Sequence, residues 1–324
     1  MTETVLITGG AGFVGLNLAE ALVQRGCEVV VYDRRPPPAP VAGARVVTAD
    51  VLDLAALDAA IGDHGVTRLV HAAAMTPGPE REMQAPEAVI DVNLRAAASL
   101  ARLGHRHGCT RLLLVGSAAV YGGTAGPTLD EDTPTRPDTL YGITKTAAEQ
   151  ALRVLGARYG LPVVIARMAW VFGPWEHASG VRDTLSPVLQ VTRLARDGRP
   201  ARLPRPDRRD WIYSRDAAEA LARLLLASRP RHDLYCLGTA GGWTLADWCA
   251  LLAERHPGFA WSVGDAGPGT PVMLHTDSDG GSLSAARFAA EFGPVAGHGL
   301  VAAFEDYMAW LDQEDVPATP QEAP

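Results

Sequence analysis

The sequence predicts an α/β fold in which a doubly wound parallel sheet is followed by a smaller C-terminal lobe. Two observations carry this prediction. An apolar strand runs directly into a glycine turn over residues 5–15, and continuous apolar stretches then alternate with helical stretches as far as residue 167. Strands that are apolar throughout are buried on both faces, which is typical of a parallel sheet with helices on each side.

The composition limits the classes of function. The 324 residues, 47% of them hydrophobic and 20% charged, suit one large domain or two closely joined ones. A net charge of -8 argues against a nucleic-acid surface, and no apolar run reaches the roughly 18 residues of a membrane span. The cysteines and histidines lack metal-ligand spacing. We therefore expect a cytoplasmic protein with small-molecule partners, no metal, no nucleic acid and no membrane.

The elements of the sheet follow from apolar spacing. Leu16, Leu18, Ala19, Leu22 and Val23 form one face of a helix that ends at Gly26. The run of β-branched residues at 28–33 predicts the second strand. Shorter apolar runs predict strands at 44–50, 68–71, 111–117 and 162–167, with helices at 54–61, 93–107 and 141–159.

The regular alternation ends after residue 167. Residues 1–170 are expected to form the dinucleotide-binding domain, 171–313 the substrate lobe, and 314–324 a disordered tail. Within the lobe we expect helices near 185–196, 245–255 and 300–311. A strand at 234–237 belongs either to the lobe or to the edge of the sheet.

The glycine turn predicts a dinucleotide site of the Rossmann type. Gly9 permits the tight turn, Gly12 lets the backbone approach a pyrophosphate, and Gly15 lets the helix pack closely on the sheet. The helix starts at Phe13 and Val14, where unpaired amides and the positive end of the helix dipole favour phosphate.

Acidic and small residues extend this cofactor site. Asp33 ends the second strand, where it accepts hydrogen bonds from ribose hydroxyls and repels a 2′-phosphate, so NAD is favoured over NADP. Arg34 and Arg35 follow and would pair with a 2′-phosphate, which leaves NADP open. Ala72 and Ala73 follow the strand at 68–71 and mark a close approach of the backbone.

Three residues point to hydride-transfer chemistry. Ser117 ends a strand, and Tyr141 and Lys145 share one face of a helix because they are four residues apart. The pKa of a free phenol is about 10, but a neighbouring ammonium and a cationic nicotinamide both favour the phenolate. Tyr141 is then a usable base, and Ser117 can hydrogen-bond the substrate oxygen.

These motifs resemble those of the extended short-chain dehydrogenase/reductase family, in its epimerase/dehydratase branch. The resemblance covers nearly the whole chain, in the segments 8–15, 117–122, 141–145, 167–174 and 209–213. It implies that Asp50, with the adjacent Val51, touches adenine and that Asn93 supports the surroundings of Lys145. It also implies a homodimer in which the helices 93–107 and 141–159 pair with their copies.

The chain departs from the family pattern where the substrate would bind. Sugar-nucleotide members commonly have an asparagine in place of Trp170, and an arginine and an acid in place of the segment 267–271. Arg209 matches the remaining phosphate-binding arginine, but a guanidinium grips a carboxylate equally well. Met75 and Arg81, in the loop after the strand at 68–71, are further candidates for substrate contact.

We therefore expect an NAD-dependent oxidoreductase that acts on a secondary alcohol or ketone of a small polyhydroxylated or acidic substrate. The alternative is an NDP-sugar epimerase or dehydratase with tightly bound NAD. A second alternative is a protein that senses NAD without catalysis, although the intact Ser117, Tyr141 and Lys145 count against it.

Overall fold

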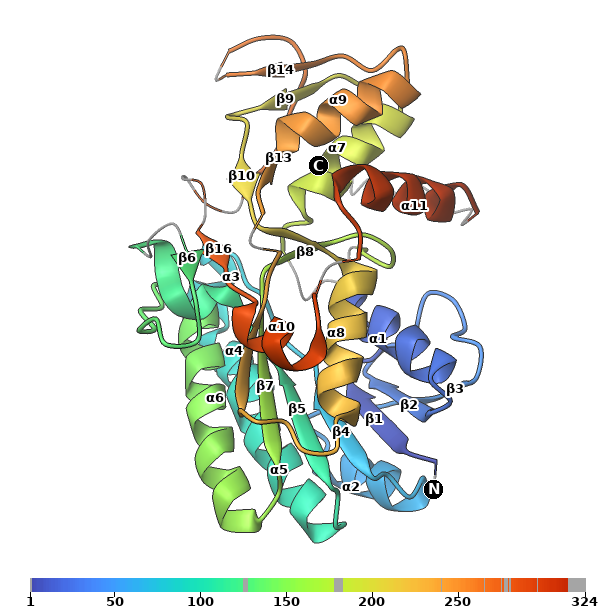
Figure 1. Cartoon of the computed structure of the whole chain (residues 1–324), viewed down its shortest axis with the longest axis vertical. Helices are drawn as coiled ribbons and strands as arrows, with labels where there is room; N and C mark the ends of the chain where they lie inside the picture. The colour runs from blue at the N-terminus through green and yellow to red at the C-terminus, as the bar shows by residue number, and fades with distance from the viewer. Residues whose placement is uncertain are drawn as a thin grey trace.

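A parallel sheet of seven strands forms the body of the protein (Figure 1). The computed structural model describes residues 2–124, 128–177, 183–239, 241–264, 266–274, 276, 279, 281–295 and 297–313. The strand order is β12-β7-β5-β4-β1-β2-β3, and all neighbours are parallel. In chain order the strands are β1 (Thr4–Thr8), β2 (Glu28–Asp33), β3 (Ala44–Thr48), β4 (Arg68–His71), β5 (Arg111–Val115), β7 (Val163–Met168) and β12 (Leu234–Leu237). The doubly wound sheet that the sequence predicts is thus confirmed.

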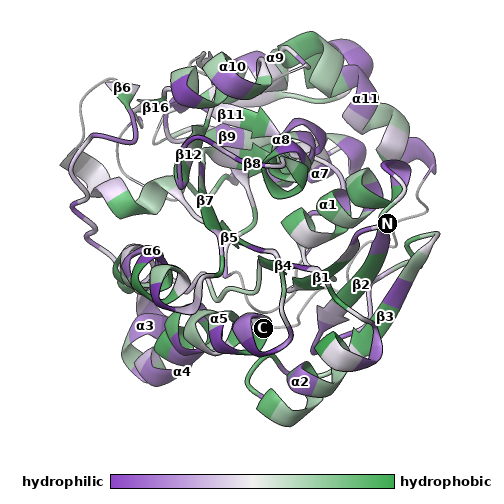
Figure 2. Ribbon diagram, turned by 60° about the horizontal axis from the view of Figure 1, so that its bottom comes forward, coloured by the Kyte–Doolittle hydropathy of each residue, from purple (hydrophilic) through white to green (hydrophobic). Residues whose placement is uncertain are grey.

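Helices cover both faces of the sheet (Figure 2). On one face, Val5 and Ile7 of β1 pack against α1 (Phe13–Gln24) and α8 (Ser214–Leu226). On the other face, Leu6 packs with α2 (Leu54–Asp63), α5 (Ala96–Arg106) and α6 (Leu140–Tyr159). Successive strand residues therefore enter two different cores, which explains why the strands are apolar throughout.

The lobe does not occupy one continuous stretch of chain. Two elements beyond residue 170 belong to the body of the protein: α8 covers one face of the sheet, and β12 pairs with β7 at its edge. The buried Arg111 of β5 fixes the end of α8, since its Nη1 donates to the carbonyls of Leu224 and Leu225 at 3.4 and 3.2 Å. Cations at a helix C-terminus satisfy its last carbonyls.

The lobe itself lies above the carboxyl ends of the strands in Figure 1. It consists of α7 (Pro187–Arg196), α9 (Leu245–Arg255) and α11 (Leu300–Gln313) with β14-β9-β15 (Trp261–Val263, Ala201–Leu203, Thr270–Pro271). Its core contains the aromatic rings of Phe172, Trp211, Tyr213, Trp248 and Tyr307. The remaining elements are short, namely α3 (Pro79–Gln84), α4 (Pro86–Ile90), η1 (Asp91–Arg95), η2 (Ala118–Thr124), β6 (Thr128–Leu129), β8 (Trp170–Phe172), β10 (Arg208–Arg209), β11 (Trp211–Tyr213), β13 (Trp243–Thr244), β16 (Ser282–Leu283) and α10 (Ala286–Phe292).

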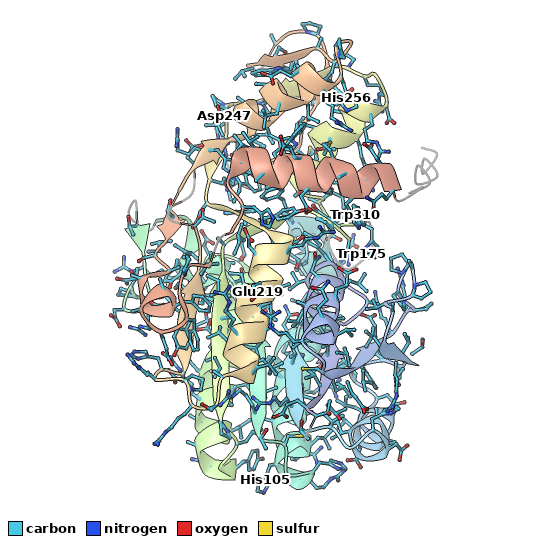
Figure 3. All side chains as sticks on the ribbon, turned by 45° about the vertical axis from the view of Figure 1, so that its right-hand side comes forward. His105, Trp175, Glu219, Asp247, His256 and Trp310 are labelled. Atoms are coloured by element: carbon cyan, nitrogen blue, oxygen red, sulfur yellow. The ribbon has the colours of Figure 1, made fainter. Side chains whose placement is uncertain are left out.

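Side chains from both parts meet where the lobe joins α1. Trp175 and Trp310 lie side by side in Figure 3, with ring centroids 5.3 Å apart. Trp175 also donates to Glu20 of α1 at 3.0 Å. Within the described ranges, no helix is long and apolar enough to cross a membrane, and no group of three or more histidine, cysteine or acidic residues is arranged to hold a metal ion.

Candidate active site

The glycine turn brings backbone against backbone at the ends of β1 and β4. A methyl group on Gly9, whose φ is +70°, would lie 2.5 Å from the amide nitrogen of Ala73. A methyl group on Gly15 would lie 2.3 Å from the carbonyl oxygen of Gly9. Gly12 caps α1 without a side chain, so the amides of its first turn, at Phe13 and Val14, have no partner within the helix.

Asp33 closes the turn from β2. Its Oδ2 accepts from the amide of Ala11, and its Oδ1 from that of Arg35, both at 3.2 Å. Burial raises the pKa of Asp33 despite these hydrogen bonds, which lower it. The side chain therefore holds the glycine turn against the end of β2.

An apolar wall continues from this turn. Val51, Ala73 and Ala96 form a small buried cluster that Leu52 and Val92 extend. Asp50 lies beside it, exposed, with Oδ1 accepting from the amide of Leu52 at 2.9 Å. Ala72 precedes Ala73 in the chain, and its backbone amide donates to the carbonyl of Thr8 at 3.0 Å.

Residues 117, 141 and 145 converge at the end of β5. Lys145 is 2% exposed, and its Nζ donates to the carbonyl of Val115 at 3.0 Å and lies 5.7 Å from the centroid of the Tyr141 ring. The Oγ of Ser117 accepts from the amide of Ala119 at 3.1 Å. A methyl group on Gly142 would lie 2.5 Å from the carbonyl oxygen of Ala119, so the start of α6 packs tightly against the segment that follows Ser117.

Lys145 is the only lysine in the chain, where the other basic side chains are arginines and histidines. It is buried beside His71, whose imidazole bonds to the hydroxyl of Thr8 at 2.9 Å. Burial, assisted by the charge of Lys145, lowers the pKa of His71 to about 3. The imidazole is thus neutral near pH 7.

The helix expected at 93–107 contains a π turn. This π turn is η1, which lies between α4 and α5, and Asn93 is its central residue. The Asn93 side chain accepts from the amide of Met75 at 2.8 Å and donates to its carbonyl at 3.0 Å. It also donates to Thr144 at 3.0 Å. Asn93 therefore joins the loop after β4 to the residue that precedes Lys145, and π turns are frequent at functional sites.

The loop after β4 is held from two sides, which the sequence did not predict. Arg81 pairs with Asp183 at 2.6 Å, and Asp183 also accepts from the amide of Gly78 at 2.7 Å. Glu82 accepts from the amides of Leu140 and Tyr141 at 3.0 and 3.4 Å and so caps α6. Such contacts join residues far apart in sequence and leave no local signal.

Trp170 and Arg209 meet in the part of the lobe next to the sheet. The guanidinium carbon of Arg209 lies 4.4 Å from the centroid of Trp170, a cation–π contact. Arg209 is 1% exposed, and its Nε and Nη2 donate to the two oxygens of Asp207 at 2.9 and 2.8 Å. Its planar fork is therefore engaged by an internal carboxylate.

The turn fits a dinucleotide, since a side chain on Gly9 or Gly15 would collide with backbone where a phosphate must be approached closely. A sheet of this topology with Ser117, Tyr141 and Lys145 at the end of β5 defines a short-chain dehydrogenase/reductase. The sequence matches the NAD dependent epimerase/dehydratase family over residues 5–238. The protein belongs to this family. This confirms the prediction of an NAD-dependent enzyme of the epimerase/dehydratase branch.

Known relatives extend over most of the chain. The UDP-glucose 4-epimerase of Azospirillum brasilense is 32% identical over 245 residues, 69% of each chain. That of Corynebacterium glutamicum is 27% identical over 294 residues, 85% of this chain and 87% of its own. The structure of WbmG from Bordetella bronchiseptica in complex with NAD superposes with a TM-score of 0.77, 27% identity and coverage of 97% and 95%.

Proposed function

We propose that this enzyme is a sugar-nucleotide epimerase or dehydratase in which NAD stays bound and the hydride returns to the substrate. The observation that carries the chemistry is the placement of buried Lys145 between Tyr141 and the end of β5. The sugar-nucleotide class is supported by relatives named as UDP-glucose 4-epimerases and a dTDP-L-rhamnose 4-epimerase. These names favour the alternative that the sequence left open over net oxidation of a small sugar acid.

The roles of the side chains follow from their chemistry. NAD, when bound to the glycine turn and Asp33, supplies the hydride acceptor. Tyr141 takes the proton of a substrate hydroxyl and later gives it back. Ser117 donates a hydrogen bond to the same oxygen. Lys145, desolvated and fixed on the Val115 carbonyl, stabilises the phenolate.

A turnover assay separates the three possible functions. Purified enzyme with UDP-glucose, and in parallel dTDP-glucose, is expected to change the sugar without net NADH. Net NADH from a panel of sugar acids and polyols, with no change in any sugar nucleotide, would instead support the dehydrogenase function. Binding of NAD with neither outcome would support a sensor.

The preference for NAD is expected to depend on Asp33. In Asp33→Ala the ratio of NAD to NADP affinity should fall by about tenfold, because the variant loses ribose hydrogen bonds and the repulsion of a 2′-phosphate. Fluorescence titration with both dinucleotides measures this, with Asp63→Ala, an exposed acid at the end of α2, as the matched control. An unchanged ratio would transfer the discrimination to Arg34 or Arg35.

We also propose that Arg209, which is held by Asp207 and lies over the ring of Trp170, is the residue that anchors the substrate anion. Arg209→Ala should weaken UDP binding to the NAD-loaded enzyme by about tenfold or more, because a charge-assisted hydrogen bond is lost. Calorimetry measures this, with the neighbouring exposed Arg208→Ala as control. If wild-type enzyme does not bind UDP, the sugar-nucleotide assignment fails. Unchanged affinity in Arg209→Ala removes only the role of the arginine.

A homodimer through α5 and α6 is the expected assembly. Ile143 and Val154 lie on α6 with exposures of 50% and 51%, eleven positions and therefore about three turns apart on one face. Large exposed apolar side chains in line mark an interaction surface. Sedimentation velocity should show a dimer that Ile143→Glu with Val154→Glu converts to monomer, whereas Val263→Glu in the lobe should not.

A further inference from the structure

A buried ion pair lies behind the residues of the candidate active site. Arg167, in β7, donates from Nε to Oε1 and Oε2 of Glu149 at 3.1 and 3.2 Å, and from Nη2 to Oε2 at 2.7 Å. The two side chains are 5% and 2% exposed. Burial opposes the charge of Arg167, but the hydrogen bonds with Glu149 outweigh it and raise the pKa of the guanidinium. The guanidinium therefore stays charged, and the carboxyl group of Glu149 is its bidentate partner.

Glu149 contacts the backbone that holds Lys145 and Ser117. It follows Lys145 by four residues, so the two side chains are neighbours on one face of α6. A methyl group on Gly116 would lie 3.3 Å from Oε1 of Glu149. Gly116 separates Val115, which accepts from Lys145, and Ser117. Because position 116 has no side chain, the carboxylate lies directly against this end of β5.

Arg167 extends the connection to the segment after Ser117. Its Nη1 donates to the hydroxyl of Tyr121 in η2 at 2.9 Å, and its guanidinium carbon lies 5.0 Å from the ring centroid. Tyr121 in turn donates to the carbonyl of Asp130 at 2.6 Å. Burial raises the pKa of Tyr121, so its hydroxyl stays protonated. One guanidinium thus joins β7, α6 and η2.

We propose that Arg167 is a positioning residue that, paired with Glu149, aligns α6 with the end of β5 and keeps the charge behind Lys145 balanced. The proposal deepens the proposed function and rests on the roles given there to Tyr141 and Lys145. If Glu149 loses its charge, Arg167 adds positive charge beside the ammonium. If the fork is lost while the charge remains, the alignment weakens but the balance persists.

Substitution of Glu149 or Arg167 leaves the other polar and charged side chains around Lys145 and Tyr141 unchanged. Glu82 faces them from α3, on the amides at the start of α6. His71 of β4 is neutral, and Tyr121 of η2 is protonated. Asp138, which precedes α6, accepts from the amide of Gly123 at 2.9 Å. None of them is altered in the variants below.

The single lysine makes the electrostatic part measurable without a substrate. Labelling with ¹³C-lysine places one lysine side chain, Lys145, in the spectrum. The Cε chemical shift of Lys145, measured against pH, gives a titration midpoint for the ammonium. The measurement is made on wild type, Glu149→Gln, Arg167→Lys and the double variant Glu149→Gln with Arg167→Met. We expect Glu149→Gln to lower the midpoint by about one pH unit, because a second cation lies nearby. Arg167→Lys and the double variant should keep the wild-type midpoint.

Turnover with UDP-glucose supplies the second readout. Arg167→Lys is expected to lower kcat by about tenfold, since lysine cannot form the fork that fixes α6. The acid limb of the profile of kcat against pH should stay unchanged in this variant. Glu149→Gln should move the acid limb to lower pH. The proposal would be overturned if Lys145 in Glu149→Gln titrated at the wild-type midpoint, or if Arg167→Lys had a normal kcat. Tyr141→Phe is the separate control: if it retains turnover, the proposed function fails while the Lys145 titration still tests the ion pair.

Discussion

Replacing Tyr141 by phenylalanine is expected to lower turnover by roughly 10²–10⁴-fold, the usual contribution of a general acid–base group. The change removes a single oxygen and keeps the ring, whose centroid lies 5.7 Å from Nζ of Lys145. Lys145 stays bonded to the carbonyl of Val115, and the glycine turn is untouched. The affinity for NAD should therefore remain close to that of wild type.

Single-turnover kinetics with UDP-glucose, together with NAD titration, measures both quantities. Tyr159→Phe is the matched control, because Tyr159 ends the same helix and stacks on His105 at the far end of the molecule from the lobe (Figure 3). Near-normal turnover in Tyr141→Phe would remove the mechanism. Loss of NAD binding together with turnover would assign Tyr141 to the cofactor site.

Gly9→Ala is expected to abolish detectable NAD binding and to destabilise the fold by about 3 kcal/mol or more. Two effects add. The backbone at Gly9 has φ +70°, which is costly for any residue with a Cβ, and that Cβ would lie 2.5 Å from the amide nitrogen of Ala73. To relieve this collision, the turn must move away from β4, which displaces the amides at the start of α1.

Gly26→Ala separates the two effects. Gly26 also has a positive φ, of +78°, but a methyl group there meets nothing within 4 Å. This control should cost only the backbone term, about 1–2 kcal/mol, and bind NAD normally. Urea unfolding and NAD titration of both variants provide the comparison. Equal losses in the two variants would show that close packing at Gly9 is unimportant.

Patterns within short stretches of sequence were enough to predict the strands, helices and turn that such patterns define. The strand expected at 234–237 is β12, Leu234–Leu237, and the helix expected at 245–255 is α9. The first strand, the glycine turn and Asp33 also occur where expected. In each case, hydrophobic spacing or a glycine with a defined backbone role lies within a few residues. The position of β12 in the sheet was left open, because a short apolar run does not specify its neighbour.

What the sequence did not predict depends on distant contacts. α8 was missed, although Ala217, Leu221 and Leu224 recur at helical spacing, since alanine contributes little to such a pattern. Asn93 was expected in a regular helix, but its bonds to Met75 and Thr144 accompany a π turn. Arg209 was identified as a candidate for anion binding, but nothing in the sequence indicated that Asp207 engages its fork. Glu149 was not singled out, because its partner Arg167 lies on another element.

The return of the chain to the sheet restricts how this enzyme can be re-engineered. A chain that stops near residue 170 would lack β12, leaving β7 as an unpaired edge along Val163–Met168. It would also lack α8, which covers apolar side chains of α1 and the central strands. Bare edges and apolar faces promote aggregation. Exchange of substrate specificity between relatives therefore calls for grafting the lobe as two separate insertions, one before α8 and one after β12, rather than joining two halves of different genes.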